Sequence, residues 1–158
     1  MKNRPLRVTD LAWDFLRAVI APGDIAVDAT AGTGQDTVFL CQCVGETGRV
    51  FAFDIQTAAL QQTKDNLEKS GYVDQVTLIH QSHDMMVPAL KAATVGERAV
   101  KAIMFNLGYF PGGDQTITTE LETTMVALNE ALSLLACGGL ITICLYPGHP
   151  GGFEEAQA

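Results

Sequence analysis

Five nearly continuous apolar runs, separated by segments with helical spacing, are the feature that most restricts the fold of this chain. Strands that are buried on both faces have such runs, whereas strands with one solvated face alternate apolar and polar residues. The alternation of buried strands with helices predicts an α/β fold, with an open and mainly parallel sheet covered by helices on both faces. The strands are expected at residues 25–30, 49–55, 76–82, 100–107 and 140–147.

Helical spacing predicts five helices around these strands. The clearest runs from about Thr119 to Ala136, where four leucines and a methionine form one stripe and two glycines follow. Another is expected directly after Gly34, with Thr33 and Asp36 at the spacing of a capping box. The remaining helices are expected at 9–21, 57–69 and 85–93.

Length and hydropathy predict one compact domain. A chain of 158 residues can bury a sizeable core, and we expect residues 1–158 to form a single domain. The mean hydropathy is +0.17, yet no apolar run approaches the roughly 18 residues that a membrane span needs. The first residues also lack a hydrophobic signal core. These features predict a cytoplasmic protein without a membrane partner.

The balance of charges restricts the possible partners. Acidic residues outnumber basic residues by 18 to 10, which gives a formal net charge of -8. This charge disfavours non-specific attraction to phosphate backbones, so an RNA partner would need a local basic group. The densest such group is Lys2, Arg4 and Arg7.

Several reactive-site patterns are missing from the sequence. The four cysteines have neither zinc-ribbon nor disulfide spacing and are interpreted as free thiols. The histidines and cysteines form no i, i+4 or C-x-x-C pair, so no metal site is expected. No serine or cysteine stands between glycines as the nucleophile of a hydrolase would.

The segment "VDATAGTGQDTVFL", residues 27–40, places a glycine-rich turn between a strand and a helix. Gly32 and Gly34 suit a sharp turn that a ligand approaches closely. A dinucleotide-binding loop would need a third small residue where this chain has Thr37, and Asp28 and Asp36 would repel its phosphates. The two acids suit a cationic ligand instead, although Asp36 could serve only as a helix cap.

Polar residues also follow the second and third strands. Asp54 comes 20 residues after Gly34, a spacing at which a carboxylate can accept hydrogen bonds from ribose hydroxyls. This spacing indicates an adenosine ligand, which S-adenosylmethionine and NAD would satisfy equally well. The alternative is that Asp54 only caps the helix that follows it. After the third strand, residues 81–84 place polar groups where an adenine ring would lie, with His83 lining that site. His80, inside the predicted strand, is expected to be a buried core residue.

The fourth and fifth strands end in candidate acceptor-binding residues. Asn106 and Tyr109 have the spacing of the Asn-Pro-Pro-Tyr loop of amino-methyltransferases, with Leu107 and Gly108 in place of the prolines. In that loop an asparagine oxygen accepts a hydrogen bond from the attacking amine. Tyr146 and His149 are expected on the same rim, where His149 could take a proton from an ammonium group. The alternatives are a purely structural turn at Asn106 and a bracing role for His149.

Four motifs together carry a family resemblance. "DATAGTGQDTVFL", "HQSHD", "NLGYFPGGD" and "YPGHPGG" resemble the small class I methyltransferases catalogued as putative rRNA methylases, from Asp10 onward. The resemblance implies a Rossmann-like fold and the cofactor S-adenosylmethionine (SAM), with S-adenosylhomocysteine as product. It also implies an RNA substrate, most of all tRNA, because some bacterial members methylate the aminomethyl group of a modified wobble uridine.

The resemblance, combined with the reading of the loops, assigns two sets of site residues. The expected catalytic and substrate-binding residues are Asn106, Tyr109, Asp114, Tyr146 and His149. The expected cofactor-binding residues are Asp28, Thr30, Gly32, Gly34, Gln35, Asp36, Thr37, Asp54, Ile55, Gln56, Ser82, His83 and Asn106.

One departure from the family concerns the fifth strand. Members usually continue with a helix and a two-stranded hairpin, whereas this sequence ends at Ala158. The fifth strand would then be a sheet edge that invites a homodimer, and a longer protein or a disordered tail would explain the same ending.

Other functions remain open at this point. A small-molecule amine methyltransferase would use the same cofactor site without RNA. A non-catalytic adenosine-binding module would keep the fold without the reaction, and a nicotinamide oxidoreductase is the least favoured alternative.

Overall fold

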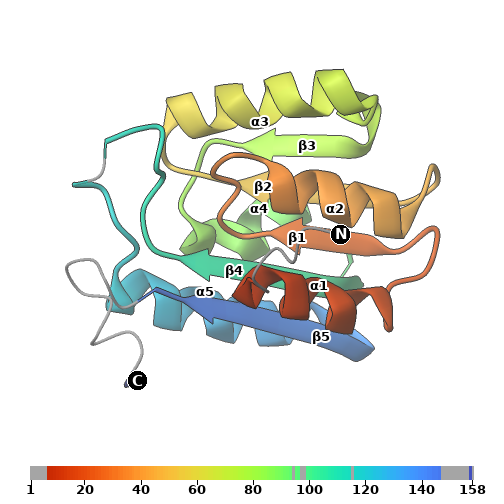
Figure 1. The fold of residues 1–158 in the computed structure, drawn as a ribbon. Coiled ribbons are helices and arrows are strands. Elements are labelled where there is room, and N and C mark those ends of the chain that lie inside the picture. The colour runs from red at the N-terminus through yellow and green to blue at the C-terminus, as the bar shows by residue number, and fades with distance from the viewer. Residues whose placement is uncertain (1–6, 94, 97–98, 115, 147–156, 158) are drawn as a thin grey trace.

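A five-stranded parallel sheet forms the centre of the molecule (Figure 1). The computed structural model describes residues 7–93, 95–96, 99–114, 116–146 and 157. Their strand order is β3-β2-β1-β4-β5, which confirms the predicted α/β fold. The strands are β1 (Ile25–Asp28), β2 (Arg49–Phe53), β3 (Val76–Ile79), β4 (Val100–Leu107) and β5 (Leu135–Leu145).

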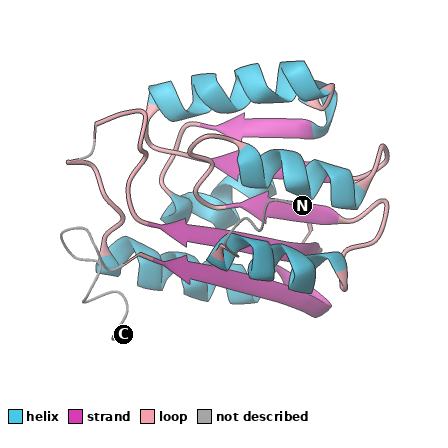
Figure 2. Cartoon of the chain, viewed as in Figure 1, coloured by secondary structure: helices cyan, strands magenta, loops and turns pink. Residues whose placement is uncertain are grey.

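Helices cover both faces of the sheet (Figure 2). One face packs against α1 (Val8–Arg17), α2 (Gln35–Val44) and α3 (Thr57–Ser70), in a core that includes Leu16, Phe39 and Leu67. The other face packs against α4 (Met86–Ala92) and α5 (Leu121–Leu134), in a core that includes Phe51, Phe105 and Ala131. Two short 3-10 helices, η1 (Val73–Gln75) and η2 (His83–Met85), complete the fold.

The strand order indicates at which edge of the sheet a ligand would bind. β1 lies between β2 and β4, so the connections leaving β1 and β4 diverge to opposite sides. In open α/β sheets the ligand lies at this reversal, beyond the carboxyl ends of the strands. The segments after β1, β2, β3 and β4 all emerge at that one edge.

β5 differs from the predicted strand at its start. α5 ends at Leu134 and β5 begins at Leu135, five residues before the predicted start at position 140. Leu135 pairs with Val100 and Leu140 pairs with Ala102, so the intervening residues bulge out of the ladder. Gly138 has a φ of 70°, which permits this bulge. The two glycines therefore lie inside a strand and not at a helix stop.

Two further sequence predictions were wrong. The N-cap of α2 is Gly34 with a φ of 80° and no side chain caps that helix, so Thr33 and Asp36 form no capping box. The Asp36 side chain instead accepts hydrogen bonds from Trp13 and Asn106. His80 lies past the end of β3, where it is exposed and its Nε2 is 2.9 Å from the Ile55 carbonyl oxygen.

None of the helices within the described residues has the length and apolarity to cross a bilayer.

Candidate functional site

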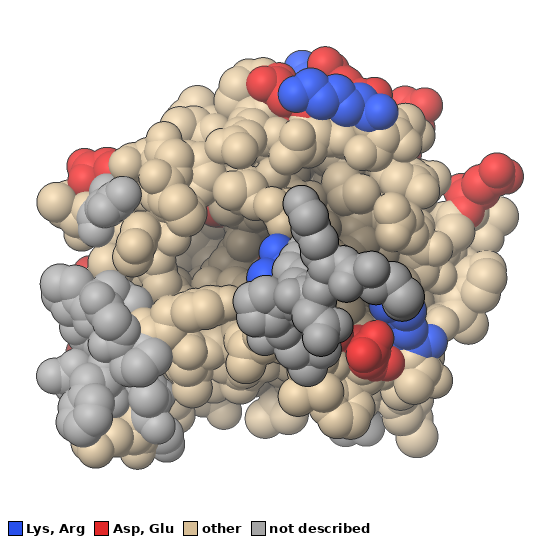
Figure 3. Space-filling view, viewed as in Figure 1, with Lys and Arg blue, Asp and Glu red and all other residues tan. Residues whose placement is uncertain are grey.

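A cavity of about 900 Å³ opens at the carboxyl ends of the strands. Figure 3 shows this face of the molecule hollowed, with mostly uncharged side chains around the hollow and charged ones gathered over α3. The strand-end segments each contribute to the wall. The lining residues are Arg7, Val8, Thr9, Trp13, residues 29–33, Gln35, Asp36, residues 54–56, residues 81–83, Asn106, residues 108–111, residues 117–119, Thr123 and Tyr146.

The two glycines after β1 have different roles. Gly32 lines the cavity with a φ of 53°, and an added Cβ would meet nothing closer than the Thr30 carbonyl oxygen at 3.8 Å. Gly34 lies outside the lining residues, and a Cβ there would be 2.7 Å from the Cα of Thr63 in α3. The first glycine leaves room on the cavity side, whereas the second permits close packing of α2 on α3.

Asp54 joins the loop after β1 to the loop after β2. Its Oδ2 accepts a hydrogen bond from the Gly32 N–H at 2.9 Å, and its Oδ1 accepts one from the Gln56 N–H at 2.9 Å. Each carboxylate oxygen keeps further acceptor capacity, because an ionised carboxylate offers about four lone-pair sites. Asp54 lines the cavity, so this capacity is available to a ligand with hydroxyl groups.

Asp28 lies beneath the cavity and does not line it. Only 1% of its surface is exposed, and it accepts hydrogen bonds from the Thr37 hydroxyl at 2.6 Å and the Thr30 N–H at 3.2 Å. Burial raises its pKa from the ordinary 3.8 to about 7, the Asp36 charge adds to the rise, and the two hydrogen bonds oppose it.

Asp36 lies on the cavity wall, close enough for its charge to act on Asp28. Burial raises its pKa, while hydrogen bonds from Trp13 and Asn106 and the charge of Arg7 lower it. One carboxyl group on the cavity wall and one buried behind it are therefore poorly solvated when charged. A cation in the cavity would stabilise the ionised form of both.

Asn106, at the end of β4, is held by two hydrogen bonds. Its backbone N–H donates to the Thr30 hydroxyl at 2.8 Å, and its Nδ2 donates to Oδ2 of Asp36. Its buried Oδ1 has no hydrogen-bond partner among the described residues. A buried carbonyl oxygen without a donor costs free energy, so this atom is suited to accept a hydrogen bond from a ligand.

The loop after β4 closes one side of the cavity. Gln56 holds it through both ends of its amide, because Nε2 donates to the Asp114 carbonyl at 3.3 Å and Oε1 accepts from the Asp114 N–H at 3.1 Å. Tyr109 and Tyr146 line the cavity while remaining 45% and 47% exposed. Two aromatic rings are therefore available at the mouth.

Over the part of the chain that the structure describes, no three His, Cys, Asp or Glu side chains gather closely enough to hold a metal ion.

The chain was then compared with known proteins. Residues 50–158 match the protein family described as "Putative rRNA methylase". The chain belongs to this family. The match confirms the resemblance that the sequence motifs carry.

The relatives of this chain include a chloroplastic tRNA (mnm(5)s(2)U34)-methyltransferase from Arabidopsis thaliana. The two are 38% identical over 160 residues, which cover 96% of this chain and 57% of the relative. The chain thus spans little more than half the length of that relative.

Solved structures agree with the fold. A structure described as a putative rRNA-methylase from Clostridium thermocellum is 43% identical with a TM-score of 0.88, over 98% of this chain and 80% of the other. A putative methyltransferase from Streptococcus mutans, solved in complex with S-adenosylhomocysteine, is 35% identical with a TM-score of 0.80, over 98% of this chain and 79% of the other. This member of the family therefore has the class I methyltransferase fold.

The cavity brings together most of the residues that the sequence assigned to the site. These are Thr30, Gly32, Gln35, Asp36, Asp54, Ile55, Gln56, Ser82, His83, Asn106, Tyr109 and Tyr146. Asp28, Gly34, Thr37 and Asp114 lie outside the lining residues, and each supports a residue or loop that lines it. His149 lies outside the described residues.

Several lining residues were missed by the sequence reasoning. Trp13 lies in α1, and Phe110, Ile117 and Thr118 lie in the loop after β4. The sequence carried one usable signal for this group, since Trp13 is the chain's single tryptophan and lies close to the first strand. Apolar residues in a loop give no comparable pattern.

Proposed function

We propose that this chain is a SAM-dependent N-methyltransferase that acts on tRNA, at the aminomethyl group of a modified wobble uridine. Three findings on related proteins support the proposal. The family is one of methylases, the Arabidopsis relative is named for methyl transfer at this nucleoside, and the Streptococcus mutans relative was solved with S-adenosylhomocysteine. The cavity of this chain fits both the cofactor and an amine.

The residues of the cavity fit SAM in size and in charge. A volume of about 900 Å³ is sufficient for a nucleoside cofactor with an amino-acid tail. Asp54 would hold the ribose hydroxyls, Gly32 leaves room for a close approach, and Ser82 and His83 would border the adenine. Asp36 provides negative charge for a cationic ligand, and SAM supplies a methyl group on a positively charged sulfur.

Asn106 is the residue that would bind the amine that accepts the methyl group. Its unpartnered Oδ1 can accept one N–H of a neutral amine, which orients the nitrogen lone pair away from that bond. Catalysis by this chain would consist of positioning, without a covalent enzyme intermediate. The buried acceptor oxygen at the end of β4, beside an acid-lined cavity, is the observation on which the proposal most depends.

The exposed tyrosines fit a nucleoside better than a small free amine. Tyr109 and Tyr146 present aromatic faces at the mouth, where an unstacked base can pack. RNA-modifying enzymes commonly bind such splayed bases between aromatic side chains.

Transfer of a labelled methyl group from SAM to tRNA tests the proposal. The tRNA is taken from cells lacking the last methylation, and product nucleosides are identified by mass spectrometry. We expect wild type to add one methyl group to the aminomethyl nucleoside. Asn106→Ala should lower kcat by about a hundredfold with SAM affinity nearly unchanged. Asp54→Ala should weaken SAM binding, measured by calorimetry.

Three results would contradict the proposal in different ways. Normal turnover by Asn106→Ala would remove its role in the reaction. Methylation of small amines but of no RNA would favour a small-molecule methyltransferase. SAM binding with no methyl transfer to any cellular RNA or amine would favour a non-catalytic module.

A further inference from the structure

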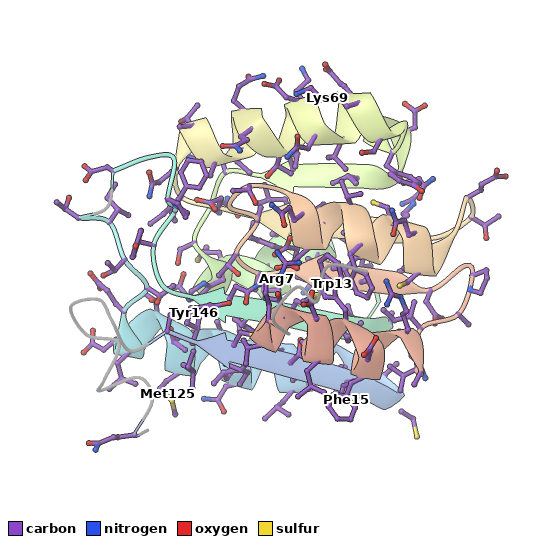
Figure 4. The ribbon with its side chains drawn as sticks, in the orientation of Figure 1. Arg7, Trp13, Phe15, Lys69, Met125 and Tyr146 are labelled. Atoms are coloured by element: carbon purple, nitrogen blue, oxygen red, sulfur yellow. The ribbon has the colours of Figure 1, made fainter. Side chains whose placement is uncertain are left out.

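Trp13 connects the first helix to the candidate active site. Its indole Nε1–H donates a hydrogen bond to Oδ1 of Asp36 at 2.6 Å, across 23 residues of sequence. The ring stacks on Phe39 of α2 with centroids 4.6 Å apart and planes 2° apart, and the Arg7 guanidinium lies 5.8 Å above it. Figure 4 shows Trp13 and Arg7 on the side of α1 that faces α2, with Phe15 on the opposite side. Trp13 is therefore fixed by contacts on both ring faces.

Asp36 connects Trp13 to Asn106, because its carboxylate binds both side chains. The second carboxylate oxygen of Asp36, Oδ2, accepts a hydrogen bond from Asn106 Nδ2. An ionised carboxylate can only accept hydrogen bonds, so the NH₂ group of the amide must face it. The Asn106 Oδ1 is then turned to the other side, where no described residue donates to it. The orientation of the amide thus depends on the carboxylate.

The geometry points to Trp13 and Asp36 as positioning residues that fix the direction of the Asn106 carboxamide oxygen. The inference rests on the proposed function, in which that oxygen accepts a hydrogen bond from the substrate amine. Without the pair, the amide could rotate by 180° and present its NH₂ group to the amine, so that two donors would meet. Trp13 acts by holding the Asp36 carboxylate in the rotamer that reaches Asn106.

A cycle of variants separates positioning from packing. Trp13→Phe keeps an aromatic ring beside Phe39 and removes the indole N–H donor together with one of the two fused rings. We expect kcat to fall about tenfold with the KM for tRNA and the affinity for SAM little changed, because misplacement of a catalytic group affects mainly the chemical step. Trp13→Phe combined with Asn106→Ala should be no slower than Asn106→Ala alone, because residues that act as a unit are not additive.

Phe15→Ala provides the matched control on the same helix. Phe15 is 57% exposed and lies outside the cavity lining, so its removal should leave kcat unchanged. If Trp13→Phe does not fold, Asp36→Asn replaces it in the cycle. Asparagine has one acceptor oxygen, so it cannot accept from both the indole and the Asn106 amide in the observed arrangement.

Tryptophan fluorescence gives a readout that needs no substrate. Trp13 is the single tryptophan of the chain, so the emission spectrum reports its surroundings alone. Asp36→Ala removes every acceptor for the indole N–H and should shift that spectrum relative to wild type, and an unchanged spectrum would overturn the hydrogen bond. A fully additive loss of kcat in the double variant would overturn the positioning role. A wild type that methylates no tRNA would contradict the proposed function, while the fluorescence would still test the contact.

Discussion

At the scale of single residues, the site is dominated by two poorly solvated carboxyl groups. Burial disfavours ionisation of both Asp28 and Asp36, and the Asp36 charge raises the pKa of Asp28 further. Arg7 reduces this effect at Asp36, but its guanidinium also pairs with Asp10 at 3.0 Å. The folded chain therefore holds negative charge that a cationic ligand would stabilise.

The raised pKa of Asp28 predicts a pH dependence of stability. Because its pKa is 3.8 when unperturbed and about 7 in the fold, the folded chain binds more protons than the unfolded chain between these values. The free energy of unfolding should therefore decrease as pH rises from about 4 to 7. Urea denaturation at several pH values measures this slope.

Asp28→Asn is the corresponding variant. The Asn oxygen can still accept from the Thr30 N–H, and the Thr37 hydroxyl can turn to accept from the amide. We expect the decrease between pH 4 and 7 to become shallower, with greater stability than wild type at pH 8. An equal slope in both proteins would show that Asp28 does not titrate in this range.

At the scale of elements, the contact between α2 and α3 sets the shape of the loop that lines the cavity. Thr63 and Asn66 of α3 donate hydrogen bonds to the carbonyls of Gly32 and Thr33, at 3.3 Å and 2.6 Å. Gly34 allows the helices to approach closely enough for these bonds. The helix on one side of the sheet thus positions the loop at its edge.

Gly34→Ala should be strongly destabilising. The new Cβ would be 2.7 Å from the Cα of Thr63, and the residue would keep a φ of 80°. We expect a loss of about 2–4 kcal/mol in the free energy of unfolding, the sum of backbone strain and overpacking. Gly71→Ala is the control, since Gly71 has a φ of 78° with nothing near its Cβ position. It should cost only about 1 kcal/mol, and equal losses would contradict the role of the Thr63 contact.

At the scale of the whole molecule, the net negative charge of the chain opposes the binding of a polyanion such as RNA. A chain with a formal charge of -8 repels RNA on average, so its basic residues must act locally. Arg7 is the described member of the basic group at the N-terminus, and it lies on the cavity wall. A tRNA would meet it beside the two exposed tyrosines.

Replacing Lys2 and Arg4 by alanine tests whether the N-terminal basic group contributes to RNA binding. We expect weaker tRNA binding and a shallower dependence of log K on log salt, by about one for each lost phosphate contact. Lys64→Ala with Lys69→Ala removes the same charge from α3 and serves as the control (Figure 4 labels Lys69). Equal effects of the two pairs, measured by filter binding, would argue against a local docking site.

The possible homodimer remains a prediction at this scale. β5 pairs with β4 on one side, and within the described residues no other strand pairs with it. Ile143 and Leu145 of this strand are partly exposed, as are Met125 and Leu132 of α5. Sedimentation of the protein would decide this: a mass of two chains would support the homodimer, and a mass of one chain would contradict it.

The sequence by itself determined the elements and the end of the sheet where the site lies. Buried strands have continuous apolar runs, and parallel strands separated by helices place their carboxyl ends together, so Asp54 and Asn106 could be assigned to one site from local pattern alone. The tertiary structure decided which side chains meet within that site. Trp13, Asp36 and Asn106 join across 23 and 70 residues, and Gly34 faces Thr63. Such contacts depend on helix packing, sheet register and side-chain rotamers, which local periodicity does not encode.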